Sequence, residues 1–279
     1  MDRWMRFPGF KKKAFTMSYD DAVQQDARLV DIMLQNGLKG TFNICTERFV
    51  PEGTKFPEGQ IHRRMTKMET YDLFNKDGIE IAVHGCRHPR LEALPDNECA
   101  YEILQDRTNI EKATGKLCRG MAYPYGTFNE KVKEIAKMCG ILYARTIDCD
   151  ESFALSEDWL ALKPTCHHNA PNLMALAKEF VEMDVWDQPR MFYLWGHSFE
   201  FEANNNWNVI EEFASFMGKR EDVWYATNIE IFEYIEAYKQ MRVSNDGKIY
   251  FNPTSTTLYF DVHFNLYELK PGETLVIEE

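Results

Sequence analysis

The sequence predicts an α/β fold, a distorted seven-unit (β/α)7 barrel followed by a small C-terminal antiparallel β appendage. Short runs of β-branched and aromatic residues alternate with longer segments of helical period, about seven times within the first 240 residues. Repeated units of this kind build a parallel sheet through right-handed crossovers. The alternation stops near residue 244, so we expect the barrel to occupy residues 1–243 and a small β extension, residues 244–279, to pack on it.

The predicted strands and helices follow one another in pairs. The strands are expected over residues 13–19, 40–45, 78–83, 117–122, 141–147, 190–195 and 223–227. The helices are expected over residues 22–35, 66–75, 96–114, 129–138, 172–183, 207–217 and 230–241. The dipeptide Asn36-Gly37 suits the end of the first helix. Thr66 and Glu69 match a capping box, and Asp96 suits the N-cap of the third helix.

The last segment of the chain has the signals of β-hairpins instead. Residues 245–247 (Asn-Asp-Gly) and 270–272 (Lys-Pro-Gly) are typical turn sequences. Between them, residues 257–265 alternate in polarity as a half-buried strand does. We therefore expect antiparallel strands here, covering an edge or an end of the barrel.

Composition and charge exclude several classes of protein. The chain has 279 residues, 44% hydrophobic and 27% charged, which is globular composition. Its net charge of −12 opposes general binding to nucleic acids or to anionic membranes. The sequence contains no stretch of 18 apolar residues and no apolar signal segment near its start. Its seven cysteines are dispersed without a Cys-x-x-Cys pair, so we expect free thiols in a cytoplasmic protein.

Polar residues follow the predicted strands where barrel enzymes carry their chemistry, at the carboxyl ends. Asp20 and Asp21 end the first strand, and His84 and His88 follow the third. One aspartate could simply cap the next helix, but one cap explains only one of the two. A His-x3-His pattern alone is weak, yet imidazoles and carboxylates are good ligands for zinc. Their shared position favours a metal site.

Two further strand ends carry candidate catalytic groups. Pro124-Tyr125-Gly126 follows the fourth strand, where it forms either an ordinary turn or a turn whose amide N–H stabilises an oxyanion. His197 follows the strand that ends at Trp195, and it is either a core histidine or a general acid. Its place at the same barrel face favours the general acid.

Taken together, these segments resemble the polysaccharide deacetylases of carbohydrate esterase family 4. The family's Thr-Phe-Asp-Asp-Gly motif resembles residues 18–22, and its His-x3-His motif is matched by residues 84–88. Its Arg-x-Pro-Tyr motif resembles residues 122–125, and its late Leu-x-x-His motif resembles residues 194–197. The order and spacing of all four motifs agree, and the resemblance covers about residues 10–240.

The resemblance implies a fold, a cofactor and a division of roles. A distorted (β/α)7 barrel would bind one divalent metal through Asp21, His84 and His88. Zinc is the favoured ion, with cobalt, nickel and iron as alternatives at such a site. Asp20 would be the general base and His197 the general acid. The backbone N–H of Tyr125 would bind the oxyanion, and the substrate would be an acetylated sugar or oligosaccharide.

The sequence departs from the family pattern in several places. The arginine of the third motif is replaced by Ala122, and Arg145 is the preferred substitute, with Arg119 as the alternative. The family's Asp-x-x-Asp-Trp motif is not recognisable, although residues 158–159 (Asp-Trp) could be a remnant of it. The residue that orients His197 is therefore not identified. Ala22 replaces the glycine of the first motif.

Four residues near the predicted mouth are candidates for substrate contact: Tyr123, Pro124, Trp195 and His168. Aromatic rings can stack on sugars, although most aromatic residues belong to the core. The adjacent His167 and His168 could contact substrate, bind a second metal or lie on a solvated loop.

Three functions remain open at this point. The first is a metal-dependent hydrolase that removes N- or O-linked acetyl groups from a carbohydrate. The second acts on a small non-peptide amide, imide or ureide, which the lack of a visible signal segment favours. The third is a catalytically silent carbohydrate-binding homologue, suggested by the missing arginine and Asp-x-x-Asp-Trp motif. The retention of Asp20 opposes this last reading.

Overall fold

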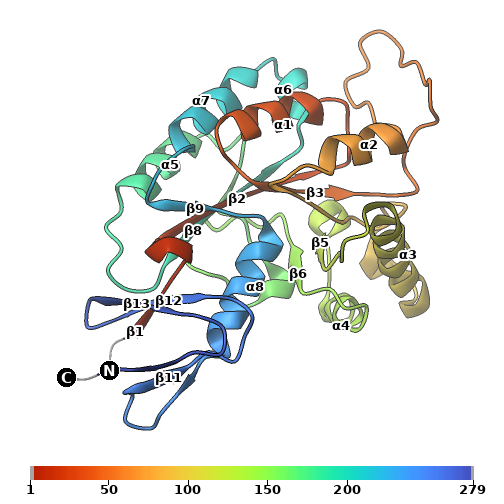
Figure 1. Ribbon diagram of the computed structural model, residues 1–279. Coiled ribbons are helices and arrows are strands. Elements are labelled where there is room, and N and C mark those ends of the chain that lie inside the picture. Colours follow the sequence, from red (N-terminus) through yellow and green to blue (C-terminus); the bar gives the residue numbers. More distant parts are fainter. Residues whose placement is uncertain (1–2, 278–279) are drawn as a thin grey trace.

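A computed structural model describes residues 3–277, and its main feature is a curled sheet of eight parallel strands (Figure 1). The strand order is β6-β5-β4-β3-β2-β8-β7, and β9 also pairs with β2. The strands are β2 (Lys13–Asp20), β3 (Gly40–Ile44), β4 (Ile79–Val83), β5 (Gly120–Ala122), β6 (Tyr143–Arg145), β7 (Cys166–His167), β8 (Arg190–Gly196) and β9 (Val223–Tyr225). The predicted fold class is confirmed. The short strand β7 was not predicted.

Helices cover the outside of the sheet. They are α1 (Asp26–Gln35), α2 (Lys67–Phe74), α3 (Asp96–Thr114), α4 (Glu130–Met138), α5 (Leu173–Glu182), α6 (Phe199–Ala203), α7 (Trp207–Met217) and α8 (Asn228–Lys239). The sequence predicted all of them except α6, which is too short to show a helical period. Among helices of the described residues, none is both long and apolar enough to cross a membrane.

The predicted helix ends are mostly confirmed. The capping box of Thr66 and Glu69 is formed at α2. Asn36 ends α1, and Gly37 follows it with φ of 69°, the left-handed region that glycine tolerates. The predicted cap by Asp96 is wrong, because Pro95 occupies the N-cap position of α3 and Asp96 is the first helical residue.

The barrel is distorted where an irregular segment replaces a strand. Residues 146–165 run between β6 and β7 and bond to both sides of the gap. Leu162 N–H donates to the carbonyl of Ala144 over 2.9 Å, and Thr165 N–H donates to the carbonyl of Tyr193 over 2.8 Å. These bonds satisfy backbone groups at β6 that would otherwise form an open sheet edge.

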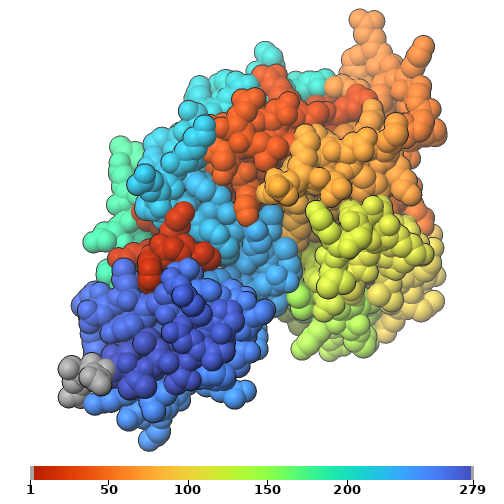
Figure 2. Space-filling model, in the orientation of Figure 1, coloured from red at the N-terminus to blue at the C-terminus, as the bar shows by residue number. Residues whose placement is uncertain are grey.

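Two three-stranded antiparallel sheets lie beside the barrel. One has the order β1 (Arg3–Arg6), β12 (Leu258–Val262) and β13 (Asn265–Leu269). The other consists of β10 (Arg242–Val243), β11 (Ile249–Phe251) and β14 (Thr274–Val276). The antiparallel strands were predicted, but their partner β1 was not. Figure 2 shows these C-terminal strands as a patch of their own next to N-terminal residues.

A continuous hydrophobic core fixes the strands that carry the polar residues. Phe15 on β2 lies opposite Phe192 on β8, and their ring centroids are 6.0 Å apart. Phe213 of α7 packs on both rings at 5.9 and 5.6 Å. Full burial of aromatic side chains contributes strongly to stability, so β2 and β8 are held in a fixed register. Their carboxyl ends are consequently rigid supports for Asp20 and His197.

Candidate active site

The polar residues singled out in the sequence gather at one end of the barrel. Asp20 ends β2 and Arg145 ends β6, whereas His84 and His197 follow directly after β4 and β8. Parallel strands bring all these positions to the same carboxyl-terminal edge. Side chains from four strands thus meet, although they are up to 177 positions apart in sequence, as between residues 20 and 197.

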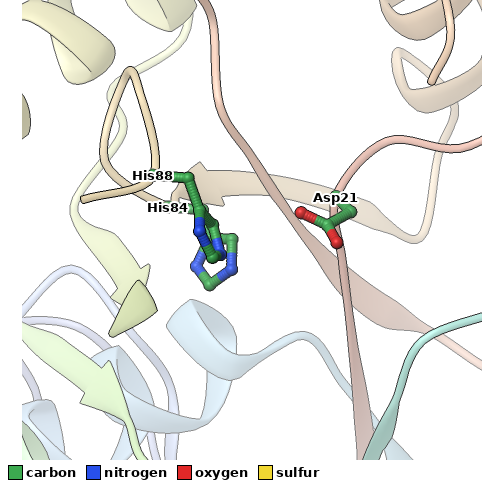
Figure 3. A group of neighbouring side chains, drawn as sticks. All are labelled: Asp21, His84 and His88. Carbon is green, nitrogen blue, oxygen red and sulfur yellow. The ribbon is translucent and has the colours of Figure 1, made fainter. Parts of the chain in front are cut away.

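Asp21, His84 and His88 form a compact group. One donor atom from each lies within 4.8 Å of the others. Figure 3 shows the Asp21 carboxylate facing the two imidazoles of the loop after β4. His88 has φ of 60°, a left-handed turn conformation that brings its ring to 4.7 Å from that of His84. We call these three residues the metal group.

The ring nitrogens of His84 have separate tasks. Nδ1 donates a hydrogen bond to the carbonyl of Ala122 over 2.9 Å, so Nε2 carries the free lone pair in the neutral ring. Burial lowers the pKa of His84, and burial together with His84 lowers the pKa of His88 to about 4. Both rings are therefore neutral near pH 7, which is the state that binds a metal. A carboxylate and two neutral imidazoles fit a zinc-type ion.

Two buried carboxylates of α3 hold the loop that carries these histidines. Asp106 accepts hydrogen bonds from the backbone N–H of Thr46 at 2.8 Å and of His84 at 2.9 Å. Glu102 accepts from the backbone N–H of Arg87 at 2.9 Å. Sequence reasoning missed both residues, because helix α3 carries many acidic residues and only packing selects these two for burial.

The loop before α2 contacts Asp21 through His62 and Arg64. Arg64 lies with Nη2 at 2.7 Å from Oδ1 of Asp21, and His62 lies with Nε2 at 3.2 Å from Oδ2. Burial would raise the pKa of Asp21, but His62, Arg64 and the nearby histidines outweigh burial and lower it. Asp21 is therefore an anion. Neither His62 nor Arg64 was predicted as a site residue.

Asp20 is buried and ion-paired with Arg145. Its Oδ1 accepts a hydrogen bond from Asn43 Nδ2 at 2.8 Å, while its Oδ2 lies 3.8 Å from Nε2 of both His84 and His197. Burial opposes ionisation, but Arg145 and the two imidazoles outweigh it and lower the pKa of Asp20. The structure thus places Arg145, the preferred substitute for the missing arginine, on the predicted base.

His197 lies between two carboxylates and is one-quarter exposed, with 25% of its side chain accessible. Its Nδ1 donates to Oε1 of Glu200 over 3.0 Å, and its Nε2 faces Asp20. Burial lowers its pKa, but Glu200, Asp20 and Asp21 together outweigh burial and raise it. Glu200 was missed as a partner. Asp158, the possible motif remnant, instead pairs with Lys133 and caps a short turn at Leu160.

Tyr125 lies at the mouth of the site. Its side chain is 51% exposed and its ring centroid is 4.5 Å from that of His88. Its φ of 61° places it in the left-handed region, which is uncommon for non-glycine residues. Its ring therefore contacts His88, a member of the metal group.

The side chains of the four predicted substrate contacts are buried. Tyr123 is 1% exposed and donates its hydroxyl hydrogen to the carbonyl of Leu160 over 2.8 Å. His168 is fully buried and stacks between the rings of Tyr19 and Phe201. The side chains of Pro124 and Trp195 are buried as well. Internal packing holds these side chains, and their contact with substrate stays a prediction. His168 is not on a solvated loop.

Fold and site together define a class of protein, a distorted (β/α)7 barrel with aspartates and histidines at the carboxyl ends of its strands. The family model of polysaccharide deacetylases matches residues 8–144. This stretch contains Asp20, Asp21, His84, His88 and Tyr125. Over this stretch, just under half of its length, the chain is similar to the polysaccharide deacetylase family.

Solved structures agree at the level of the fold. A candidate polysaccharide deacetylase from Mycobacterium smegmatis is similar at 16% identity, with 86% of this chain and 96% of that chain covered and a TM-score of 0.57. The Xyl-CE4 domain of a multidomain xylanase from the hindgut metagenome of Trinervitermes trinervoides is similar at 15% identity, with coverages of 81% and 92% and a TM-score of 0.51.

A shorter match concerns the deacetylase PplD from Streptococcus pyogenes. It has 19% identity over 47% of this chain and 55% of that chain, with a TM-score of 0.39. The chain thus spans about half the length of that protein. None of the curated proteins compared with this chain matches it. The two matches with TM-scores of 0.57 and 0.51 show that this chain shares their fold.

Proposed function

We propose that this protein is a metal-dependent hydrolase that removes N- or O-linked acetyl groups from a carbohydrate. The observation that carries this proposal is the convergence of a metal group, an arginine-paired carboxylate and an oriented imidazole at one end of the barrel. Each group has a separate task in acyl transfer to water, and the family assignment of residues 8–144 supports the combination.

Asp21, His84 and His88 would hold one divalent cation. Three protein ligands leave an open coordination position, which is typical of catalytic rather than structural sites. Zinc suits the set best, and cobalt, nickel or iron also accept carboxylate and imidazole ligands. When bound, such an ion acidifies a water molecule and polarises the acetyl carbonyl.

Asp20 would accept the proton of the attacking water. Its carboxylate is kept ionised by Arg145 and lies 3.8 Å from His84 Nε2, next to the proposed metal position. Arg145 also fixes the orientation of the carboxylate, because the pair is buried and Asn43 holds the second oxygen.

Tyr125 and His197 would act on the acetyl group and on the leaving group. The backbone N–H of Tyr125 would donate to the developing oxyanion, a contribution of about 3–4 kcal/mol for a single donor. His197 would give its Nε2 proton to the departing amine or alkoxide. A general acid of this kind typically contributes about 10²–10⁴-fold to the rate.

The substrate would be an acetylated sugar or oligosaccharide, in keeping with the family. We also propose a cytoplasmic location: all seven cysteines are free thiols, six of them buried, which suits a reducing compartment. The net charge of −12 favours neither nucleic acids nor anionic membranes as partners.

Acetate release from a substrate panel tests the proposal. The protein would be stripped with a chelator, reloaded with zinc, and assayed on acetylated chitooligosaccharides, acetylated xylan, cyclic imides and ureides. We expect acetate from an acetylated carbohydrate only in the reloaded sample. Turnover restricted to imides or ureides would replace the proposed substrate class, and no turnover of any compound would favour the silent homologue.

A further inference from the structure

Glu200 is surrounded by three imidazoles at the edge of the proposed active site. Its Oε1 accepts from Nδ1 of His197 at 3.0 Å. Its Oε2 lies 3.0 Å from Nε2 of His168 and 3.3 Å from Nε2 of His167. No function assigned so far explains why one carboxylate on the short helix α6 meets three histidines.

The Nδ1 atoms of His167 and His168 indicate that these two rings direct an Nε2–H, and not a lone pair, toward Glu200. His167 Nδ1 accepts a hydrogen bond from the backbone N–H of Asn169 at 3.1 Å, so its neutral ring carries hydrogen on Nε2. His168 Nδ1 lies 3.2 Å from the hydroxyl of Tyr19. A carboxylate oxygen of Glu200 lies 3.0 Å from Nε2 and can only accept, which favours hydrogen on Nε2 and leaves Nδ1 to accept from the Tyr19 hydroxyl.

The segment after β7 therefore fixes the direction of the Glu200 carboxylate. Besides the two rings, Asn169 Nδ2 donates to Oε2 over 2.9 Å. Asn169 thus donates to Oε2, the two imidazole nitrogens lie within 3.3 Å of the same oxygen, and Oε1 is left for His197. His168 can reach this position because Gly196 has no side chain, since a Cβ there would lie 2.0 Å from His168 Nδ1.

We propose that Glu200 is the positioning residue of the general acid, holding the Nδ1–H of His197 so that Nε2 faces Asp20 and the leaving group. This inference rests on the proposed function. It fills the role left open by the missing Asp-x-x-Asp-Trp motif with a residue three positions after the histidine, on α6. His167, His168 and Asn169 contact Oε2 of Glu200 and thereby hold its carboxylate in this orientation.

The electrostatic surroundings of His197 agree with this role. The charged and titratable groups that act on it are Glu200 from α6, Asp20 and Asp21 from the end of β2, and His167 and His168 from the segment at β7. Only the carboxylates favour the protonated ring. Of these, Glu200 is the one that forms a direct hydrogen bond.

A titration of His197 tests the inference without relying on activity. The zinc-loaded protein, labelled with ¹⁵N, would be followed by histidine side-chain NMR, with the His197 signals assigned by His197→Gln. We expect hydrogen on Nδ1 in the neutral ring, because Nδ1 donates to Glu200. Glu200→Gln should lower the midpoint by about one pH unit, since an adjacent anion favours the charged ring.

Glu202→Gln is the matched control. Glu202 lies on the same helix, two residues further, but it bonds to Arg63 and Gln25 and not to a histidine. This variant should leave the His197 midpoint unchanged. If Glu200→Gln also leaves the midpoint and the protonated nitrogen of His197 unchanged, the inference is wrong.

A comparison of leaving groups gives a second readout. An amine needs a proton in order to depart, whereas 4-nitrophenolate does not. Glu200→Gln should therefore lower kcat about 10²-fold or more on an N-acetylated chitooligosaccharide, with KM within about twofold, and lower kcat on 4-nitrophenyl acetate much less. Equal losses on both substrates would contradict the positioning role. If the wild-type protein releases no acetate from either substrate, the proposed function fails and the titration alone decides the role of Glu200.

Discussion

Two clusters of the same residue types lie side by side at the carboxyl ends of the strands, and they differ in what they can do. Asp21, His84 and His88 form the metal group, whereas His167, His197 and Glu200 form a second cluster that is equally compact. In both, three donor atoms lie within 4.8 Å of one another. Residue types and interatomic distances therefore do not distinguish the metal group from the second cluster.

The two clusters differ in the hydrogen-bond partner of Nδ1 of His84 and of His167, the ring nitrogen that points away from the centre of each cluster. In the metal group, His84 Nδ1 gives its hydrogen to a carbonyl, which leaves a lone pair on Nε2. In the second cluster, His167 Nδ1 receives a hydrogen from a backbone amide, which leaves hydrogen on Nε2. The first arrangement suits a cation and the second suits a carboxylate. The backbone around a histidine thus decides its chemistry.

The largest effect should come from removing a ligand of the metal group. His84→Ala should reduce bound zinc from about one equivalent to near zero and abolish acetate release, because two ligands do not retain a catalytic metal. His167→Ala is the matched control from the second cluster and should keep its zinc. Elemental analysis after dialysis measures both. Zinc lost in the control and kept in His84→Ala would reverse our distinction between the clusters.

Asp20→Asn separates metal binding from catalysis within the site. The variant should retain zinc, since Asp20 is outside the metal group, and should lower kcat about 10²–10⁴-fold because the attacking water loses its base. Steady-state acetate release and metal content would be measured on the same sample. Near wild-type turnover with zinc present would remove Asp20 from the proposed mechanism.

Arg145→Met should mainly affect stability. It leaves the Asp20 carboxylate buried without its cation, which should lower the free energy of unfolding by about 3–5 kcal/mol. The double variant Asp20→Asn, Arg145→Met removes both charges and should recover part of the loss. Urea denaturation measures the three proteins. A single variant as stable as the wild type would show that His84 and His197 suffice to compensate Asp20.

The pH dependence of zinc binding should also distinguish the metal group from ordinary histidines. A ligand imidazole must be neutral, and a ring with the usual pKa near 6.5 is mostly protonated at pH 6. Burial lowers the pKa of His84 and lowers that of His88 to about 4. Zinc affinity, measured by competition with a chromogenic chelator, should therefore change little from pH 7 to pH 5.5 and fall below about pH 4. A steep loss centred near pH 6.5 would contradict these shifts.

The smallest effect on stability and zinc binding is expected at residues 62–64, the loop that contacts both Asp21 and helix α6. Arg63 bonds to Glu202 on α6, while its neighbours His62 and Arg64 contact Asp21. The Arg63–Glu202 pair is partly exposed, so Arg63→Ala should cost only about 0.2–1 kcal/mol in the free energy of unfolding. Zinc content should be unchanged. Loss of zinc in this variant would mean that the loop controls the metal group.

Several features of the site could be predicted from the sequence because strand ends are local signals. Asp20, Asp21, His84 and His197 each follow a run of strand-forming residues, and parallel strands of one barrel present these ends at one face. Glu200 could not be selected, because an alternating acidic and aromatic run also suits an exposed surface. Its spacing of three from His197 was the available signal, and it acquires meaning only when residues 199–203 form a helix.

The sequence alone determined the order of β and α units, the antiparallel C-terminal strands and the residues at the strand ends, since periodicity and turn chemistry act over a few positions. The tertiary structure decided which cations meet the aspartates, which aromatic rings are buried, and which nitrogen of each histidine carries hydrogen. These properties depend on contacts between residues far apart in the chain, such as Arg145 with Asp20 and Tyr19 with His168. The physical reason is that burial and hydrogen-bond partners are set by packing, which local sequence patterns do not encode.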